Sequence, residues 1–394
     1  MSTSGVPGVG KIPDQWTVKT LKQLSPSQTV GVVINPSSYF DNTGTVPFLV
    51  GSNVGENSIA WQSARRISEV SNRTLAASRL SAGDLVTVRV GEPGITAVVP
   101  PELDGCNCAS MMIVRQHSSF DSQWLCHVMN SRIGRAQVEG VQYGTAQKQF
   151  NISDAVNFTY PVPPLSEQKA IAAVLGDVDA LIRALDRLIV KKRDLKQAAM
   201  QQLLTGQTRL PGFNGKWGTR PLGDVAFIRN QKVLPYQVDP DTLCIELEHL
   251  GQGDGRLLTS STARASTSSK YRFVSGDVLF GRLRSYLRKY WIADRDGICT
   301  TEIWPLVVNP NLAFNGFLYA LVQTTAFIEM AGISYGTHMP RADWAVIRAF
   351  QVRLPRLDEQ VAIATALSDM DAELAALEQR IEKTCLLNTT ALVE

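Results

Sequence analysis

Apolar residues recur at alternating intervals of four and three along two long stretches of the chain, and the second stretch repeats the first 192 residues later. The first stretch starts at Leu165 and continues to Thr205, and the second starts at Leu357. Such spacing places apolar side chains on one seven-residue stripe of a helix. The two stripes consist of Ile171, Leu175, Val178, Ile182, Leu185 and Ile189, and of Ile363, Leu367, Met370, Leu374, Leu377 and Ile381.

The residues around each stretch predict where the helices begin and end. Pro163 and Pro164 end an extended segment, because residues that precede a proline avoid the helical region. Ser166 and, in the second copy, Asp358 are suitable N-caps, and Gly206 suits the left-handed conformation that ends many helices. The first helix is therefore expected to span about 39 residues, roughly 58 Å at ~1.5 Å per residue.

A long helix with one narrow apolar stripe needs a partner. The simplest arrangement pairs the two helices with each other as an antiparallel coiled coil inside one chain, which gives the chain a pseudo-two-fold axis. Two alternatives stay open: each helix could cover its own globular domain, or the helices could mediate dimerisation. The second copy stops at Glu394, which aligns with Gln202, so the sequence has no counterpart of Leu203-Leu204-Thr205-Gly206.

Short motifs outside the helices follow nearly the same offset, while the segments between them differ. These pairs are Trp16 and Trp217, Gly83-Asp84-Leu85-Val86 and Gly276-Asp277-Val278-Leu279, and Tyr143-Gly144-Thr145 and Tyr335-Gly336-Thr337. The repeat is too long for a solenoid, whose periods are about 20–50 residues. It therefore indicates two globular domains that share one backbone arrangement and differ in the side chains between the repeated motifs.

Each globular block combines short strand patterns with a helical stretch, which predicts an α+β fold. The expected strands are 47–50, 84–90, 110–114, 243–247, 277–280 and 302–308, and the expected helical stretches are 121–130 and 314–330. We therefore expect residues 1–160 to form a first domain, 161–206 a central helix and turn, 207–357 a second domain, and 358–394 a distal helix.

Composition favours a soluble, cytoplasmic protein with a polyanionic partner. The 394 residues are 44% hydrophobic and 19% charged, with no apolar run long enough to span a membrane and no signal-peptide pattern at the start. Residues 206–357 carry 18 Lys and Arg against 12 Asp and Glu, whereas residues 358–394 carry 2 against 8. A basic block suits nucleic acid, although an ordinary mixed surface would also allow this balance.

The sequence offers no complete catalytic motif. It has no Walker loop, no dinucleotide-binding glycine motif and no His-Glu-x-x-His. The six cysteines are scattered apart from Cys106 and Cys108, so reduced core thiols are expected rather than a zinc site. Asp241, Glu246 and Glu248 only weakly resemble a nuclease carboxylate set. We expect no metal, no cofactor and no active site in this chain.

Basic, aromatic and amide side chains instead gather on glycine-rich loops in both blocks. Arginine and lysine can neutralise phosphates, and arginine, glutamine and asparagine can read base edges. The candidate DNA-binding residues are Arg65, Arg66, Arg89, Tyr143, Thr145, Gln147 and Lys148 in the first block, and Lys270, Arg282, Arg284, Tyr286, Arg288, Lys289, Thr337, His338 and Arg341 in the second.

These motifs together resemble the DNA-specificity subunits of type I restriction–modification enzymes, over nearly the whole chain. The resemblance depends on Pro164-Leu165-Ser166-Glu167-Gln168 and its echo Leu357-Asp358-Glu359-Gln360, where Arg356 replaces the second proline. It also depends on Gln201 to Gly206, on Gly83 to Gly91, and on Tyr335 to Arg341. Each motif is a modest signal, and their repeated order makes the combination specific.

The resemblance implies a function as well as a fold. Two target-recognition domains would each read one half of a split site in double-stranded DNA, with the helices setting the spacer. The helices would also dock two methylation subunits that carry S-adenosylmethionine, and restriction subunits that use ATP and Mg would join them. The competing interpretation is a coiled-coil scaffold that binds proteins and reads no DNA.

Overall fold

The computed structural model describes residues 1–6, 9–33, 35–145, 147–333 and 340–390. Its contacts divide the chain into two compact units: unit 1 comprises Met1–Asp186 with Gln379–Glu394, and unit 2 comprises Arg187–Glu378. Both boundaries fall inside long helices, whereas the sequence-based division follows the helix ends and stays a prediction. Within the described part of the chain, no helix combines the length and apolar character needed to cross a membrane.

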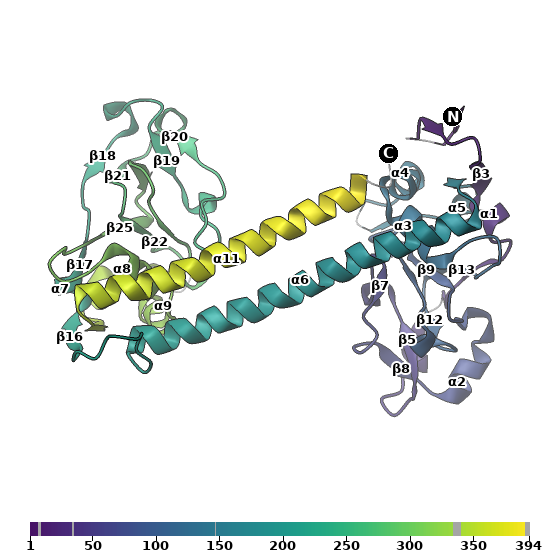
Figure 1. The fold of residues 1–394 in the computed structure, drawn as a ribbon, viewed down its shortest axis with the longest axis horizontal. Helices are drawn as coiled ribbons and strands as arrows, with labels where there is room; N and C mark the ends of the chain where they lie inside the picture. The colour runs from purple at the N-terminus through teal and green to yellow at the C-terminus, as the bar shows by residue number, and fades with distance from the viewer. Residues whose placement is uncertain (7–8, 34, 146, 334–339, 391–394) are drawn as a thin grey trace. The chain divides into compact units, whose positions relative to one another are not determined.

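Unit 1 contains a four-stranded sheet, a three-stranded sheet and several two-stranded pairs (Figure 1). Its strands are β1 (Ser2–Thr3), β2 (Lys11–Ile12), β3 (Thr17–Thr20), β4 (Gln28–Val30), β5 (Val46–Leu49), β6 (Val54–Gly55), β7 (Ser58–Ile59), β8 (Arg65–Ile67), β9 (Leu85–Val88), β10 (Val90–Gly91), β11 (Thr96–Val98), β12 (Asn107–Cys108), β13 (Met111–Val114), β14 (Lys148–Gln149) and β15 (Thr159–Val162). Its helices are α1 (Leu21–Leu24), α2 (Glu69–Thr74), α3 (Ser122–Asn130), α4 (Arg132–Val141), α5 (Ile152–Ala155) and the first half of α6 (Leu165–Thr205).

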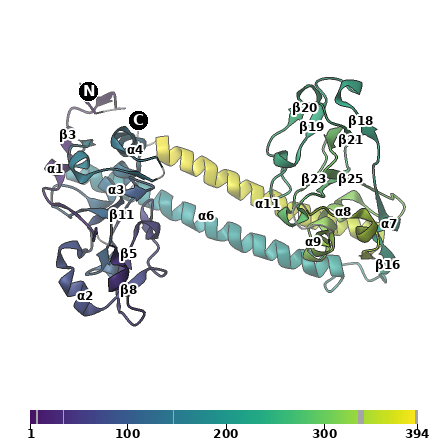
Figure 2. The same cartoon turned by 180° about the vertical axis from the view of Figure 1, so that it is seen from behind.

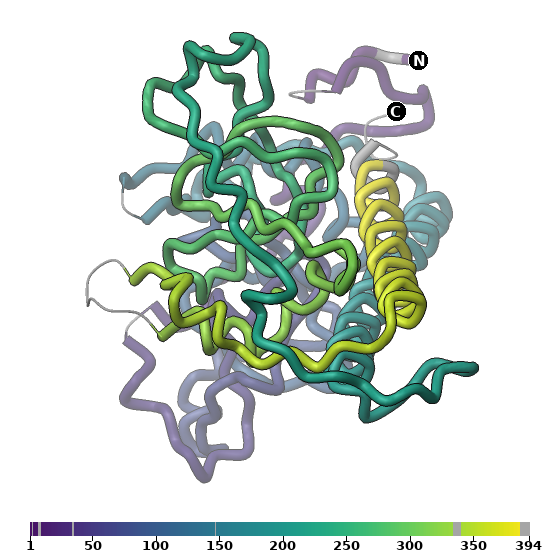
Figure 3. The backbone as a smooth tube through the Cα atoms, turned by 90° about the vertical axis from the view of Figure 1, so that its left-hand side faces the viewer, coloured from purple at the N-terminus to yellow at the C-terminus, as the bar shows by residue number. Residues whose placement is uncertain are grey.

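Unit 2 contains a four-stranded and a five-stranded sheet, with α8 beside α11 (Figure 2). Its strands are β16 (Gly218–Pro221), β17 (Ala226–Ile228), β18 (Lys232–Val233), β19 (Leu243–Ile245), β20 (Ser261–Thr262), β21 (Lys270–Phe273), β22 (Val278–Gly281), β23 (Tyr290–Ile292), β24 (Gly297–Thr300), β25 (Ile303–Val308) and β26 (Gln351–Leu354). Its helices are α7 (Leu222–Val225), α8 (Asn315–Val322), α9 (Thr325–Gly332), α10 (Trp344–Ile347) and most of α11 (Leu357–Thr390), which is the yellow helix of Figure 3.

The two units repeat one sheet topology. The order β11-β9-β13-β4 in unit 1 matches β23-β22-β25-β17 in unit 2, and the terminal pair β15–β3 matches β26–β16. A parallel pair recurs as well, formed by β12 with β5 and by β24 with β19. The prediction of two α+β domains on one frame is therefore confirmed within each unit.

The helical stretches differ from the prediction in two respects. The segment predicted as one helix over 314–330 is two helices, α8 and α9, because Thr324 starts a new helix by accepting a hydrogen bond from the Phe327 backbone N–H at 3.3 Å. Ser131 does the same between α3 and α4, accepting from Ile133 N–H at 3.2 Å. Sequence periodicity missed α4 for the same reason, since a hydroxyl can cap a new helix without any proline or glycine.

Both long helices begin slightly earlier than predicted, and α6 ends where predicted. Pro164 C=O accepts from Gln168 N–H at 3.0 Å, so α6 begins at Leu165 and Ser166 lies inside its first turn. The start of α11 at Leu357 shifts in the same way. At the other end, Gly206 has φ +70°, the left-handed conformation predicted for it.

The repeated Glu-Gln pair at each helix start connects the helix to its own domain. Gln168 is buried and accepts from the Asp121 N–H at the start of α3, at 2.8 Å, while its amide donates to Pro163 C=O at 2.9 Å. Gln360 repeats both bonds with Phe314 N–H and Pro355 C=O, at 2.9 and 3.0 Å. The neighbouring glutamates accept the indole N–H of Trp16 and of Trp217. These motifs therefore join helix and domain into one folding unit.

All twelve predicted stripe residues are buried or half-buried. Ile171 packs against the core of unit 1, and Ile363 and Leu367 belong to the core of unit 2 together with Met200 and Leu203 from α6. The alternative that each helix covers its own domain is therefore correct for the first turns of both helices.

Within unit 2 the helices also pair with each other, and they run antiparallel. Lys192 Nζ lies 2.7 Å from Glu373 Oε1, and Lys196 Nζ lies 2.5 Å from Asp371 Oδ1, so later residues of α6 meet earlier residues of α11. Each of these partly exposed ion pairs contributes at most about 1 kcal/mol. Burial of the apolar stripe therefore supplies most of the stabilisation, and the charges favour the antiparallel direction.

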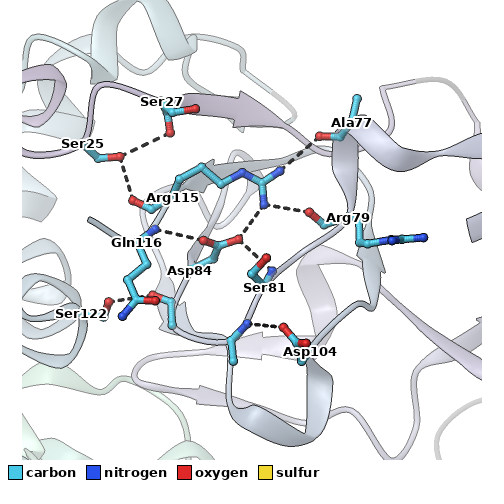
Figure 4. Close-up of polar contacts among 12 residues, drawn as sticks. Ser25, Ser27, Ala77, Arg79, Ser81, Asp84, Asp104, Arg115, Gln116 and Ser122 are labelled. Carbon is cyan, nitrogen blue, oxygen red and sulfur yellow. Dashed lines mark hydrogen bonds and ion pairs between the residues drawn. The ribbon is translucent and has the colours of Figure 1, made fainter. Parts of the chain in front are cut away.

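A buried aspartate supports the turn before a central strand of each four-stranded sheet, and Figure 4 shows the one in unit 1. In unit 1, Asp84 accepts from Arg115 Nη1 at 2.6 Å, from Ser81 N–H at 2.9 Å and from Gln116 N–H at 3.0 Å. The Arg115 guanidinium also donates to the Arg79 C=O at 2.8 Å. The carboxylate thus closes the turn and joins two strands through one set of charge-assisted hydrogen bonds.

Unit 2 makes the same turn with an arginine from the edge strand β17, which pairs with β25 and not with β22. Asp277 accepts from Arg229 Nε and Nη2 at 2.7 and 2.9 Å, and from Val274 N–H at 3.0 Å. The hydrogen bonds from Asp277 raise the pKa of Arg229. Arg115 follows β13 whereas Arg229 follows β17, which shows that the aspartate position is repeated and the source of its partner is not.

The cysteines form no disulfide. Five of the six are buried and Cys385 is exposed, and burial raises the pKa of Cys106 to about 12. Across the described ranges, no three His, Cys, Asp or Glu side chains come together in a group able to hold a metal ion.

Candidate nucleic-acid interface

In unit 2, the hairpin between β22 and β23 brings two separately predicted segments together. Leu283 bridges to Arg341, Arg284 N–H donates to Pro340 C=O at 2.9 Å, and Ala342 N–H donates to Arg282 C=O at 2.8 Å. The candidates on 282–289 and Arg341 therefore share one edge of the domain. Thr337 and His338 lie outside the described residues.

Unit 1 has the same arrangement at the hairpin between β9 and β11. Strands β10 and β14 pair, which sets Gly91 opposite Lys148. Phe150 N–H donates to Arg89 C=O at 3.3 Å, the counterpart of the bond from Ala342 to Arg282 in unit 2. Tyr143 also pairs with Gln149 through two backbone bonds of 2.9 Å. Arg89, Tyr143 and Lys148 are thus brought together, with Thr145 and Gln147 exposed on the same loop.

Arg65 and Arg66 occupy a different part of unit 1. Both lie on β8 in the three-stranded sheet, where the Arg65 guanidinium is 5.7 Å from the centre of the Phe40 ring and Arg66 Nη1 donates to Thr45 C=O at 2.7 Å. Among the described residues, no hydrogen bond or ion pair joins them to the β10–β14 edge. They stay candidates on a separate surface.

Two of the predicted lysines are held by the protein itself. Lys270 is only 2% exposed, and its ammonium lies 2.6 Å from Glu246 Oε1 and 2.8 Å from Ser268 Oγ. It is therefore corrected to a buried ion-pair residue, because its charge does not reach the surface. Lys289 donates to the C=O groups of Leu247 and Leu250 at 2.7 and 2.9 Å, which restricts its reach.

Two arginines at the unit 2 edge have close protein partners that the sequence did not indicate. Arg341 meets the Glu302 carboxylate with Nε at 3.0 Å from both oxygens, and these hydrogen bonds raise the pKa of Arg341. The Arg282 guanidinium lies 5.3 Å from the ring centre of buried Trp304, and its buried Nε has no hydrogen-bond partner among described residues. The one sequence feature that could have indicated Glu302 as a partner is its position, since it is an acidic residue at the start of a predicted strand in a basic block.

The remaining candidates of the hairpin face outward. The Arg284 and Tyr286 side chains are exposed, and half-buried Arg288 has Nη2 3.3 Å from Thr325 Oγ1. Neither Arg284 nor Arg288 forms an ion pair with an acidic residue in the described part of unit 2. This edge can therefore offer cations and an aromatic ring to an anionic, base-containing ligand.

Comparison with known proteins identifies this architecture. Residues 214–384 match the family model described as the type I restriction modification DNA specificity domain. The chain is 26% identical over 238 residues to the type I restriction enzyme MjaVIII specificity subunit of Methanocaldococcus jannaschii, an alignment that covers 55% of this chain and 56% of that protein. The chain is therefore similar to type I specificity subunits, and its residues 214–384 match their DNA specificity domain.

A second specificity subunit shows the same degree of similarity. The EcoDI specificity subunit of Escherichia coli is 24% identical over 194 residues, covering 48% of this chain and 41% of that subunit. The chain thus spans about half the length of the curated relatives it matches.

Solved structures share the fold over nearly the whole chain. The type I S subunit from M. genitalium gives a TM-score of 0.61 at 15% identity, covering 98% of each chain. A chain from work on complex assembly and conformational transition of the type I R-M system gives 0.58 at 18% identity, covering 97% of each.

Proposed function

We propose that this chain is the sequence-specific DNA-recognition subunit of a type I restriction–modification complex, in which each domain reads one half of an asymmetric bipartite site. The observation that carries the proposal is the repeated edge. Both units fix an arginine at the end of a hairpin strand with the same backbone bond, from Phe150 to Arg89 and from Ala342 to Arg282. The side chains around these arginines differ, which suits two readers of different sequences.

In this proposal the subunit recognises and does not catalyse. Its partners are double-stranded DNA, two methylation subunits and the restriction subunits. S-adenosylmethionine, ATP and Mg would be held by those partner subunits, and the complex would act in the cytoplasm. The specificity-subunit relatives support this assignment of roles.

A second apolar stripe on α6 supports docking of the methylation subunits. Val174, Leu181, Leu188 and Leu195 are exposed and lie seven residues apart, beside the buried stripe. Such flanking positions usually carry charged side chains in a two-stranded coiled coil, and an apolar residue at each of them is typical of a bundle with more helices. We propose that helices of a methylation subunit cover this stripe, and that α6 and α11 set the spacer between the half-sites.

A coiled-coil scaffold that binds proteins alone is the second candidate function, favoured by the same exposed stripe. Salt dependence separates the two. If the assembled complex neutralises about four phosphates, its affinity for duplex DNA should fall about 10²-fold between 50 and 200 mM salt. Gel shift or fluorescence anisotropy measures this directly. An absence of DNA binding at low salt would favour the scaffold.

A further inference from the structure

The paired strands of the hairpins at the two candidate edges are equivalent residue by residue. In unit 1, Leu85 pairs with Val98, and in unit 2, Val278 pairs with Ile292 in the same register. The strands close in the same way, since Val88 N–H donates to Ile95 C=O at 2.8 Å and Gly281 N–H donates to Lys289 C=O at 2.8 Å. The connecting loop is one residue longer in unit 2. The loops can therefore be compared position by position from each end.

Two positions of this loop have left-handed backbones in both units, and the residue types differ. Unit 1 places Gly91 and Gly94 there, with φ of +94° and +98°. Unit 2 places Arg284 and Arg288 there, with φ of 51° and 50°. Glycine adopts this conformation without a steric penalty, whereas an L side chain is strained in it. Stability of the fold alone would therefore favour glycine at both positions, as in unit 1. The presence of arginine at both positions in unit 2 requires an explanation other than stability.

The surrounding structure holds the strained turn of unit 2 in place. Arg284 N–H donates to Pro340 C=O at 2.9 Å, Gly253 N–H donates to Arg288 C=O at 2.9 Å, and Ser285 Oγ donates to the Ala331 C=O at 3.1 Å. Strained backbones persist where neighbouring contacts over-determine them, and such places are often functional. Between the two arginines, residues 285–287 form one 3₁₀ turn whose middle residue, Tyr286, is 59% exposed.

We infer that this turn is a built DNA contact: Arg284 and Arg288 hold phosphates, and Tyr286 inserts its ring into the base stack of the half-site read by unit 2. The inference rests on the proposed function and adds how one half-site is held. Arginine binds phosphate oxygens with paired donors, and inserted or stacked side chains recur in proteins that distort DNA. The unit 1 loop carries Glu92 and Pro93 instead, so only the unit 2 half-site is unstacked.

Replacing each arginine by glycine separates function from folding. In the full chain assembled with its methylation subunits, Arg284→Gly and Arg288→Gly should leave Tm unchanged or raise it by about 2 °C, because strain is removed. Each should weaken DNA binding about tenfold at low salt, because a phosphate contact is lost. Arg295→Ala is the matched control, since Arg295 is an exposed arginine of the same unit outside the loop. Unchanged affinity in both glycine variants would overturn the inference.

Tyr286→Ala tests the inserted ring, with Tyr236→Ala as its control. Tyr236 is 79% exposed and is also the middle residue of a 3₁₀ turn, Pro235–Gln237, without flanking arginines. The probe 2-aminopurine is placed at positions of the site other than the bases that are methylated, because methyltransferases extrude their target base. Bound by the wild-type complex, the DNA should then gain fluorescence at one base step of one half-site. Tyr286→Ala should abolish this signal and weaken binding about tenfold, whereas Tyr286→Phe and Tyr236→Ala should retain both.

Two outcomes separate failure of the proposed function from failure of the inferred contact alone. A wild-type complex that binds no DNA at low salt overturns both the proposed function and this inference. A complex that binds its site, with Tyr286→Ala matching wild type in fluorescence and affinity, overturns the inference alone.

Discussion

Replacing Asp84 by alanine should lower the free energy of unfolding of unit 1 by about 3–5 kcal/mol. The carboxylate is buried, and its removal leaves the Arg115 guanidinium and the Ser81 and Gln116 N–H groups without their acceptor. The Arg115 guanidinium is half-buried and would keep only the C=O groups of Arg79 and Ala77 as acceptors, so breaking this pair costs far more than losing a surface pair. Urea unfolding followed by circular dichroism measures the change.

Asp104→Ala is the matched control for Asp84→Ala. Asp104 is an exposed aspartate that accepts one bond, from Ala82 N–H at 2.9 Å, and its loss should cost about 1 kcal/mol. Unit 2 also has one buried and one exposed aspartate at this turn. Asp277→Ala should therefore cause a large loss in the free energy of unfolding, and Asp296→Ala a small one. Equal small losses for buried and exposed aspartates would show that the turn does not depend on its ion pair.

Replacing Leu188 and Leu195 together by glutamate should prevent the chain from co-purifying with the methylation subunit that we propose as its partner. Burying a leucine side chain contributes about 1.5–3 kcal/mol, so losing two contacts should weaken association by at least about 10²-fold. The two side chains are 37% and 49% exposed, so the chain itself should keep its Tm. Pull-down and analytical ultracentrifugation measure the association.

Val190→Glu controls for charge on the same helix. Val190 is an exposed apolar residue of α6 that lies outside the seven-residue stripe. The Val190→Glu variant should co-purify with the methylation subunit as the wild-type chain does. Normal assembly of the Leu188→Glu, Leu195→Glu variant would show that the stripe is not the docking surface.

The sequence predicted what depends on periodicity and repetition. The stripes, the two related α+β domains and the glycine C-terminus of α6 follow from local spacing, and the structure confirms them. In each unit the candidate residues of the hairpin and those of the later loop lie at one edge of the domain. The sequence indicated this only because the two segments occur in the same order in both copies.

The partners of individual charges could not be predicted, because they lie far apart in the chain. Lys270 meets Glu246, and Arg341 meets Glu302, across 24 and 39 residues. A loop cation and a buried ion pair look alike in sequence until the strands that join them are known. The break between α8 and α9 depends on the single hydroxyl of Thr324, and helix propensities do not show that a helix ends at such a residue.

The central claim is that two different readers share one spacer, and methylome sequencing tests it most directly. The strain should carry either the wild-type chain or a variant with seven residues inserted after Asp186 and seven after Glu378, which leaves both units intact. The insertion keeps the stripe and adds about 10.5 Å, or about three base pairs. The account predicts a bipartite methylated motif whose halves are unchanged and whose spacer lengthens. A continuous motif, or an unchanged spacer in the variant, would contradict it.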